Sequence, residues 1–161
     1  MKKYNFLKLA FAIAISELAG IVGSVFTVSA IPGWYAELEK PAINPPGWVF
    51  GPVWVTLYAL MGISLFLIWK NDSSVSSKDR KRAFILFFIQ LFLNAIWSII
   101  FFGLKSPGWA FADIVLLWLA IVWTIVAFHR VFRPAAYLLA PYLLWVSFAL
   151  WLNYSIWTLN I

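Results

Sequence analysis

Few residues in this chain of 161 amino acids could carry out conventional catalysis. There is no cysteine, so thiolate chemistry, disulfides and a cysteine-based zinc site are excluded. The single histidine, His129, has no second histidine with which to share a metal, and we expect no metal site. No Ser-His-Asp set, phosphate-binding glycine loop or pair of catalytic carboxylates is apparent. Any chemistry would therefore have to come from tryptophans, from a bound ligand or from light.

Two carboxylates stand inside long apolar runs. Glu17 is in the middle of the first run, and Asp113 is about one turn from the start of the fourth, where the helix dipole lowers its cost. A carboxyl group inside a membrane-spanning helix should face the protein interior or be protonated. No Lys or Arg lies at a matching depth as a relay partner. The pattern favours a structural or gating role for these acids over proton transport.

Aromatic and polar residues recur at helical spacing in three of the apolar runs. The sets are Trp54, Tyr58 and Met61, then Asn94, Trp97 and Phe101, and finally Trp145, Ala149 and Leu152. Residues three, four and seven positions apart share one helix face. Together the three faces would form a cavity with flat aromatic walls, suited to a large, flat, mostly apolar ligand. Plain helix packing explains the same stripes, so spacing alone leaves both interpretations open.

The elements that must position these residues are membrane-spanning helices. The chain is 64% hydrophobic and 11% charged, with a mean hydropathy of +0.90, whereas soluble domains are about half apolar and a quarter charged. Five continuous apolar runs reach the roughly 20 residues that a bilayer requires. They cover 6–31, 48–69, 83–103, 109–128 and 135–158. The sequence predicts an all-α integral membrane protein, a bundle of five transmembrane helices in a single domain over 1–161.

The basic residues indicate the orientation of the bundle. Five spans place the N-terminus and the second and fourth connections on one side, with ten of the twelve basic residues, and leave Lys40 and Lys105 on the other. The positive-inside rule then puts the N-terminus in the cytoplasm. Membrane orientation accounts for the net charge of +6, so we expect no nucleic-acid binding. The start resembles a signal peptide, but its apolar run is too long and contains Glu17, so we expect a retained helix.

The first outer connection, 32–47, differs from an ordinary turn. It contains Trp34 and the prolines Pro41, Pro45 and Pro46. Proline fixes its own φ and restricts the residue before it, so this connection should have a defined shape. We interpret it as a lid over the outer end of the bundle.

Small residues form a stripe along the first run. Ser16, Gly20, Gly23 and Thr27 lie on one helix face and would let another helix backbone approach closely. The stripe could mediate dimerisation or packing within one bundle, and spacing does not separate the two.

Several stretches, in order along nearly the whole chain, resemble the TspO/translocator protein family of tryptophan-rich sensory proteins. They are Trp34-Tyr35, Leu38-Glu39-Lys40-Pro41, Pro45-Pro46-Gly47-Trp48-Val49-Phe50-Gly51-Pro52-Val53-Trp54, Leu57-Tyr58, Leu93-Asn94, Trp97, Phe101-Phe102-Gly103, Gly108-Trp109-Ala110, Pro141-Tyr142-Leu143-Leu144-Trp145, Phe148-Ala149 and Leu152-Asn153-Tyr154. One set falls in or beside each predicted helix. This ordered match is far more specific than any single motif.

The resemblance implies a five-helix bundle, usually a homodimer, with a cavity that opens toward the first connection. Members bind porphyrins and related tetrapyrroles, and some bind sterols or synthetic benzodiazepine-type ligands. By position, the ligand-lining residues would be Trp54, Tyr58, Asn94, Trp97, Trp109, Trp145, Ala149 and Leu152. Some bacterial members are reported to degrade porphyrin with light and oxygen through two tryptophans, here Trp54 and Trp145.

From this resemblance we expect a membrane receptor or sensor that binds porphyrin as its ligand, without a separate cofactor. The alternatives are a porphyrin-degrading enzyme and a transporter of porphyrin or lipid. Sterol binding has less support, because no Lys or Arg follows Leu152-Asn153-Tyr154 to complete the cholesterol-recognition pattern. No inverted repeat or coupling charge favours a transporter. The orientation fits a bacterial cell membrane better than a mitochondrial outer membrane.

Overall fold

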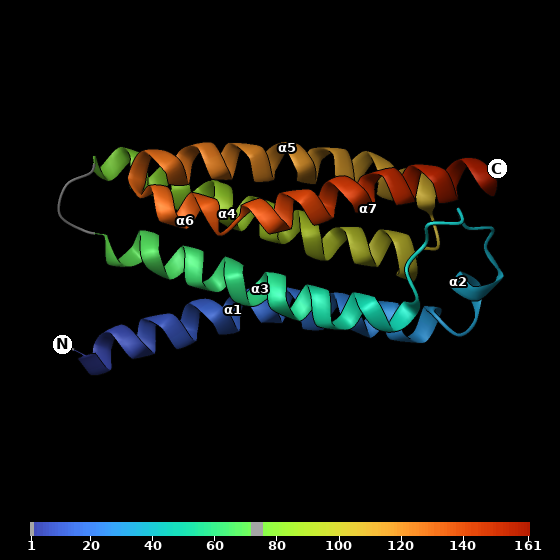
Figure 1. Ribbon diagram of the computed structural model, residues 1–161, viewed down its shortest axis with the longest axis horizontal. Coiled ribbons are helices and arrows are strands. Elements are labelled where there is room, and N and C mark those ends of the chain that lie inside the picture. The colour runs from blue at the N-terminus through green and yellow to red at the C-terminus, as the bar shows by residue number, and fades with distance from the viewer. Residues whose placement is uncertain (1, 72–75) are drawn as a thin grey trace.

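The computed structural model describes residues 2–71 and 76–161, and this part of the chain is helical, without strands. Figure 1 shows long helices running side by side, with the N-terminus at one end and the C-terminus at the other. The elements are α1 (Lys2–Ala30), α2 (Trp34–Glu37), α3 (Gly47–Lys70), α4 (Ser77–Ser98), the π-helical turn η1 (Ile99–Gly103), α5 (Pro107–Val131), α6 (Arg133–Tyr137) and α7 (Ala140–Leu159). Within these described residues, five segments are long and apolar enough to cross a membrane. The predicted all-α bundle of five transmembrane helices is therefore confirmed.

The predicted helix limits differ from the observed ones mainly in the fifth span. The run 135–158 was expected to be continuous, but it is broken between α6 and α7, where Leu138 and Leu139 form a turn. Pro141, in the first turn of α7, has no N–H to offer the carbonyl four residues earlier, so an uninterrupted helix would lose that hydrogen bond. The other predicted runs fall inside their helices or within one residue of them. The third helix starts earlier than expected, at Ser77, where Ser76 caps it.

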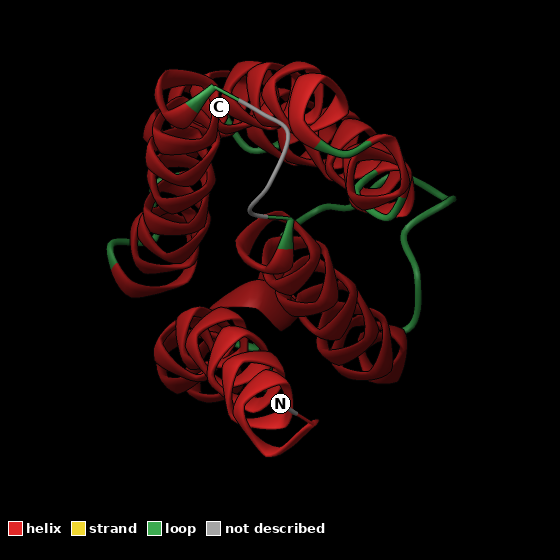
Figure 2. Cartoon of the chain, turned by 90° about the vertical axis from the view of Figure 1, so that its left-hand side faces the viewer, coloured by secondary structure: helices red, strands yellow, loops and turns green. Residues whose placement is uncertain are grey.

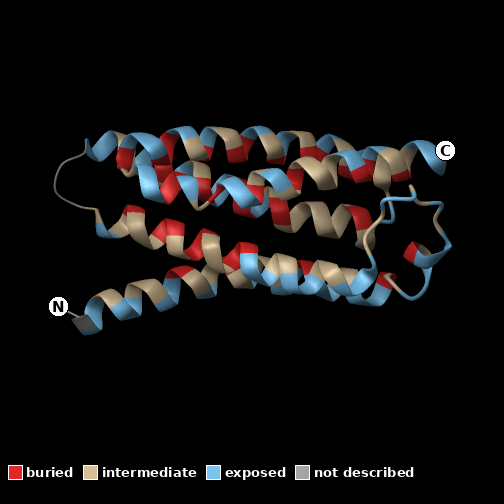
Figure 3. Cartoon of the chain, in the orientation of Figure 1, coloured by how far each residue is buried: buried red, intermediate tan, exposed pale blue. Residues whose placement is uncertain are grey.

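The helices pack tightly toward the N-terminal end of the bundle. Met61, Ile68, Phe87 and Phe128 are wholly buried there, and the Phe87 and Phe128 rings stack with centroids 6.0 Å apart. Viewed along the bundle, the helices surround a common centre (Figure 2), and buried residues mark the faces turned inward (Figure 3). Helix α3 meets α4 and α7 only over short stretches, and the open space lies at the end of the bundle near the lid. The bundle is therefore dense at its base and less closely packed under the lid.

The small-residue stripe of α1 is used inside the bundle. A Cβ added at Gly20 would lie 2.4 Å from the Tyr58 ring, and one at Gly23 would lie 2.8 Å from the Ser98 hydroxyl oxygen. Ser16 is completely buried and donates a hydrogen bond to the Ala12 carbonyl. These small residues therefore serve helix packing within one bundle. A dimer would have to use another surface.

Gly62 of α3 marks the closest approach of two helix backbones. A Cβ at this position would lie 2.5 Å from Ile13 Cα and 2.9 Å from the Ala12 carbonyl oxygen, both backbone atoms of α1. Backbone cannot rotate away as a flexible side chain can, so only glycine fits here without moving α1.

We predict that Gly62→Ala lowers the stability of the detergent-solubilised protein by about 1–3 kcal/mol, the usual cost of overpacking. Gly51→Ala is the matched control on the same helix, because a Cβ at Gly51 meets no atom within 4 Å. Thermal unfolding followed by circular dichroism measures both. Equal melting temperatures for the two variants would show that α1 and α3 do not depend on this contact.

Candidate functional site: an aromatic cavity

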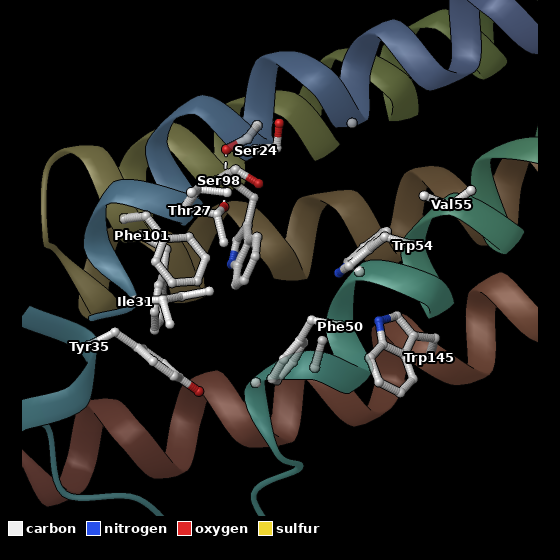
Figure 4. A pocket seen from close by; sticks show the side chains of 18 of the residues that line it. Ser24, Thr27, Ile31, Tyr35, Phe50, Trp54, Val55, Ser98, Phe101 and Trp145 are labelled. Carbon is white, nitrogen blue, oxygen red and sulfur yellow. Dashed lines mark hydrogen bonds between the residues drawn. The ribbon is translucent and has the colours of Figure 1, made fainter. Parts of the chain in front are cut away.

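A cavity of about 430 Å³ lies between the outer halves of α1, α3, α4 and α7, under the lid. Its volume falls in the range of roughly 300–1,000 Å³ that is usual for small-molecule sites. Figure 4 shows Phe50, Trp54 and Trp145 on one side of it, with Ile31 and Phe101 across from them. The aromatic residues that line it are Tyr35, Trp48, Phe50, Trp54, Tyr58, Trp97, Phe101, Phe102 and Trp145. Flat aromatic surfaces therefore make up much of the wall.

Six of the eight residues predicted to line a ligand site do line this cavity. They are Trp54 and Tyr58 from α3, Trp97 from α4, and Trp145, Ala149 and Leu152 from α7. The Trp54 ring stacks on the Tyr58 ring, with centroids 5.5 Å apart and planes 28° apart. The helical spacing of these residues placed them on one side of each helix, and the bundle turns those sides toward one another.

Asn94 and Trp109 do not line the cavity. Asn94 is buried behind Tyr58, in hydrogen bonds to two tyrosines. Trp109 is 75% exposed near the start of α5, on the outer surface of the bundle. A tryptophan at the end of a span is typical of the membrane interface, where its ring has an apolar body and a polar edge. For these two positions the resemblance predicted a contact with the cavity that the geometry does not provide.

A hydrogen-bonded chain ties three helices together beneath the cavity. The Tyr58 hydroxyl of α3 donates to the Asn94 Oδ1 of α4, and Asn94 Nδ2 donates to the Tyr142 hydroxyl oxygen of α7 at 2.9 Å. All three side chains are buried. An amide inside a membrane bundle needs partners because lipid offers none. This chain therefore fixes the position of the Tyr58 ring, on which Trp54 stacks.

A second set of hydrogen bonds fixes Trp97. Its indole Nε1–H donates to Asn153 Oδ1 at 2.9 Å, and Asn153 Nδ2 donates to the Pro107 carbonyl at 2.8 Å. Trp97 stacks on Phe101, with centroids 5.2 Å apart. Phe101 belongs to the π-helical turn η1, which was not predicted; the Leu104 N–H bonds to the Ile99 carbonyl, five residues back. The extra residue in this turn alters the direction of the side chains that follow Trp97.

Few polar groups face the cavity. Of the described residues that line it, Glu17 is the one carboxylate, and none is Lys, Arg or His. The Trp145 Nε1–H is buried and has no hydrogen-bond acceptor in the described part of the chain. Asp113 is buried outside the lining, with its Oδ2 also unpartnered. No cluster of residues able to hold a metal ion occurs among the residues that the structure describes.

The lid, 32–47, is held by hydrogen bonds within itself and to the end of α7. The Tyr35 hydroxyl donates to Asn44 Oδ1 at 3.1 Å, and burial raises the pKa of this phenol, an effect that the bond to Asn44 partly offsets. Glu39 exchanges two backbone hydrogen bonds with the Asn160 side chain at the end of α7. Of the predicted lid residues, Trp34 packs edge-on against Phe101, Pro41 accepts a turn bond from the Asn44 N–H, and Pro45 with Pro46 leads into α3.

The cavity is open along one side as well as near the lid. Its largely exposed lining residues include Ile21 and Val28 of α1, at 57% and 69%, and Val55 of α3, at 58%. These residues lie within membrane-spanning helices, so the opening between α1 and α3 faces the lipid.

Sequence reasoning missed several lining residues. Phe50 was identifiable, because it lies four positions before Trp54 on the same helix face. Tyr35 was quoted only as part of the family resemblance, and nothing in its local sequence shows that it folds back over the cavity. Glu17 was noted as an intramembrane acid but not connected with the ligand site.

Fold and cavity together define a multi-pass helical membrane protein with an aromatic internal site. A model of the TspO/MBR family matches residues 12–158. The chain is 46% identical over 158 residues to the tryptophan-rich protein TspO of Chlorobaculum tepidum, across 96% of both chains. It is 44% identical over 156 residues to the tryptophan-rich protein TspO of Archaeoglobus fulgidus, across 97% of this chain and 99% of the other.

Another relative is the translocator protein of Homo sapiens. The identity is 43% over 140 residues, which cover 87% of this chain and 82% of that one. The chain belongs to the TspO/MBR family.

We predict that Tyr142→Phe lowers the stability of the bundle by about 0.6–1.7 kcal/mol, the range measured for hydrogen bonds between membrane helices. Tyr137→Phe is the control, because Tyr137 is 65% exposed and lies outside the hydrogen-bonded chain of Tyr58, Asn94 and Tyr142. A double-mutant cycle of Tyr58→Phe with Tyr142→Phe, read by unfolding in mixed detergent, should be non-additive, since both tyrosines bond to Asn94. Strict additivity would mean that the chain does not act as one unit.

Proposed function

We propose that this protein binds porphyrins and related flat tetrapyrroles in the aromatic cavity, as a membrane receptor or sensor that also sequesters free porphyrin under stress. The observation that carries the proposal is the pair Trp54 and Trp145, which face one cavity from α3 and α7. Stacking of a macrocycle on such indoles adds binding free energy beyond that of burial alone.

The proposal also includes the orientation of the bundle in the membrane. The N-terminus lies at the end with most of the basic residues, and we place that end in the cytoplasm of a bacterial cell. The lid and the mouth of the cavity then face outward. A homodimer, as in the family, is part of the proposal; its interface would lie outside the α1 stripe, which is already used within the bundle.

We predict that protoporphyrin IX quenches tryptophan fluorescence saturably, and that Trp145→Phe weakens its binding about threefold to tenfold, as loss of an aromatic contact worth about 0.5–1.5 kcal/mol requires. Trp123→Phe is the matched control, because Trp123 is 58% exposed on α5 and does not line the cavity. The titrations give the dissociation constant of protoporphyrin IX for the wild type and for each variant. If Trp145→Phe bound protoporphyrin IX as tightly as Trp123→Phe, the ligand would not contact Trp145.

A second candidate function is photo-oxidation of the bound porphyrin, with molecular oxygen as the oxidant. It is favoured by the stacking of the Trp54 indole on the Tyr58 ring, which places two oxidisable aromatic groups at the cavity wall. The roles of Trp54 and Trp145 would then be catalytic as well as binding.

We predict for this second function that illuminated, aerated samples with bound protoporphyrin IX form new absorbing products, and that Trp54→Phe with Trp145→Phe slows their formation by at least about tenfold, the factor that 1.36 kcal/mol of barrier supplies. The rate is normalised to bound porphyrin, so that weaker binding does not imitate lost chemistry. Bleaching at the wild-type rate in the double variant would assign the reaction to the pigment itself.

A further inference from the structure

Glu17 lies at the inner end of the cavity, beside Tyr58. Glu17 and Tyr58 both line the cavity. One turn further along α1, Gly20 lets the Tyr58 ring lie directly against the helix. Thirteen residues separate Glu17 from Ala30 at the end of α1, so the carboxyl group is about 20 Å below the outer end of that helix. It thus belongs to the floor of the cavity, at membrane depth.

The carboxyl group of Glu17 has no partner of its own in the described part of the chain. No ion pair or hydrogen bond to it is found there, and the Tyr58 hydroxyl already donates to Asn94. No described lining residue is Lys, Arg, His or Asp. An ionisable group inside a membrane is costly unless it pairs, and it ordinarily marks a functional position. A cationic partner for Glu17 would therefore have to come from outside the chain.

We propose that Glu17 recognises a positively charged nitrogen on the ligand, so that the cavity selects flat aromatic cations over carboxylates of the same shape. The fitting class is a fused aromatic ring system with a protonated amine or ring nitrogen at one edge. Aromatic walls hold the rings, and the carboxylate at the floor takes the charge. A ligand that carried its own carboxylate to the floor would meet a like charge in an apolar site, which is strongly unfavourable.

For a tetrapyrrole with acidic side chains, the same charge fixes the orientation. Its carboxylates would point away from Glu17, toward the end of the bundle where Lys40 lies in the lid and Lys105 lies between η1 and α5. This inference rests on the cavity being a ligand site, as proposed above, but not on the ligand being a porphyrin.

The test uses three probes of one shape: 9-aminoacridine, a cation at neutral pH, acridine-9-carboxylate, an anion, and uncharged acridine. Each is titrated by its own fluorescence against the protein in a neutral detergent. We expect the wild type to bind the cation at least about tenfold more tightly than the anion, and Glu17→Gln to reduce that ratio to within about threefold of unity. Acridine should bind both proteins equally, which shows that the cavity of Glu17→Gln is intact.

Two further variants separate recognition from general charge effects. Glu17→Asp keeps the carboxylate and should keep the preference for the cation. Glu37→Gln removes an exposed carboxylate of α2, outside the cavity, and should leave the ratio unchanged. An unaltered ratio in Glu17→Gln, or a wild type that binds the anion as tightly as the cation, overturns the inference.

The outcomes also distinguish this inference from the proposed function. Saturable binding of protoporphyrin IX without saturable binding of 9-aminoacridine overturns the role of Glu17 and leaves porphyrin binding in place. Failure of both ligands to bind overturns the cavity as a ligand site, and the role of Glu17 with it.

Discussion

The hydrogen bonds of one buried amide, Asn94, hold the base of the cavity together. Asn94 accepts from Tyr58 of α3 and donates to Tyr142 of α7, and it is itself part of α4. These helices otherwise meet only briefly along α3. Lipid gives no reward for closing an apolar gap between helices, because its chains are as apolar as the side chains they replace. A specific polar tie is therefore needed where close packing ends, and the open space begins directly above it.

The contrast between the two ends of the bundle follows from this constraint. Below the amide, Gly62 lets the backbones of α1 and α3 approach closely, and large side chains fill the centre. Above it, the cavity walls are held by ties to fixed points rather than by dense packing. Trp97 is anchored through Asn153 to the start of α5, and the lid is anchored through Asn160 to the end of α7. The walls can thus keep their shape around a space of about 430 Å³.

The sequence predicts the bundle well, because the period and length of apolar runs depend only on local chemistry. It also predicts which side of a helix Trp54 and Tyr58, or Trp145 and Ala149, share. It does not predict how far each side chain lies from the cavity, or which other side chain stands in between. Asn94 shares a helix face with Trp97, yet Tyr58 from α3 lies between Asn94 and the cavity. The turn at Ile99–Gly103 and the tie between Glu39 and Asn160, which are 121 positions apart, depend on tertiary contacts that no local pattern records.

The opening between α1 and α3 changes what can make a ligand specific for this cavity. A ligand that arrives through lipid gains little from leaving water, because it has already left it, and it competes with acyl chains for the same apolar walls. Shape and polar groups must then supply the difference in binding free energy. Rigid indole and phenol faces favour flat rings over flexible chains, since a flexible chain loses more conformational freedom when it is held. The Glu17 carboxyl group is a polar function that an acyl chain cannot satisfy, so a flat ligand that pairs with it has an advantage that lipid lacks.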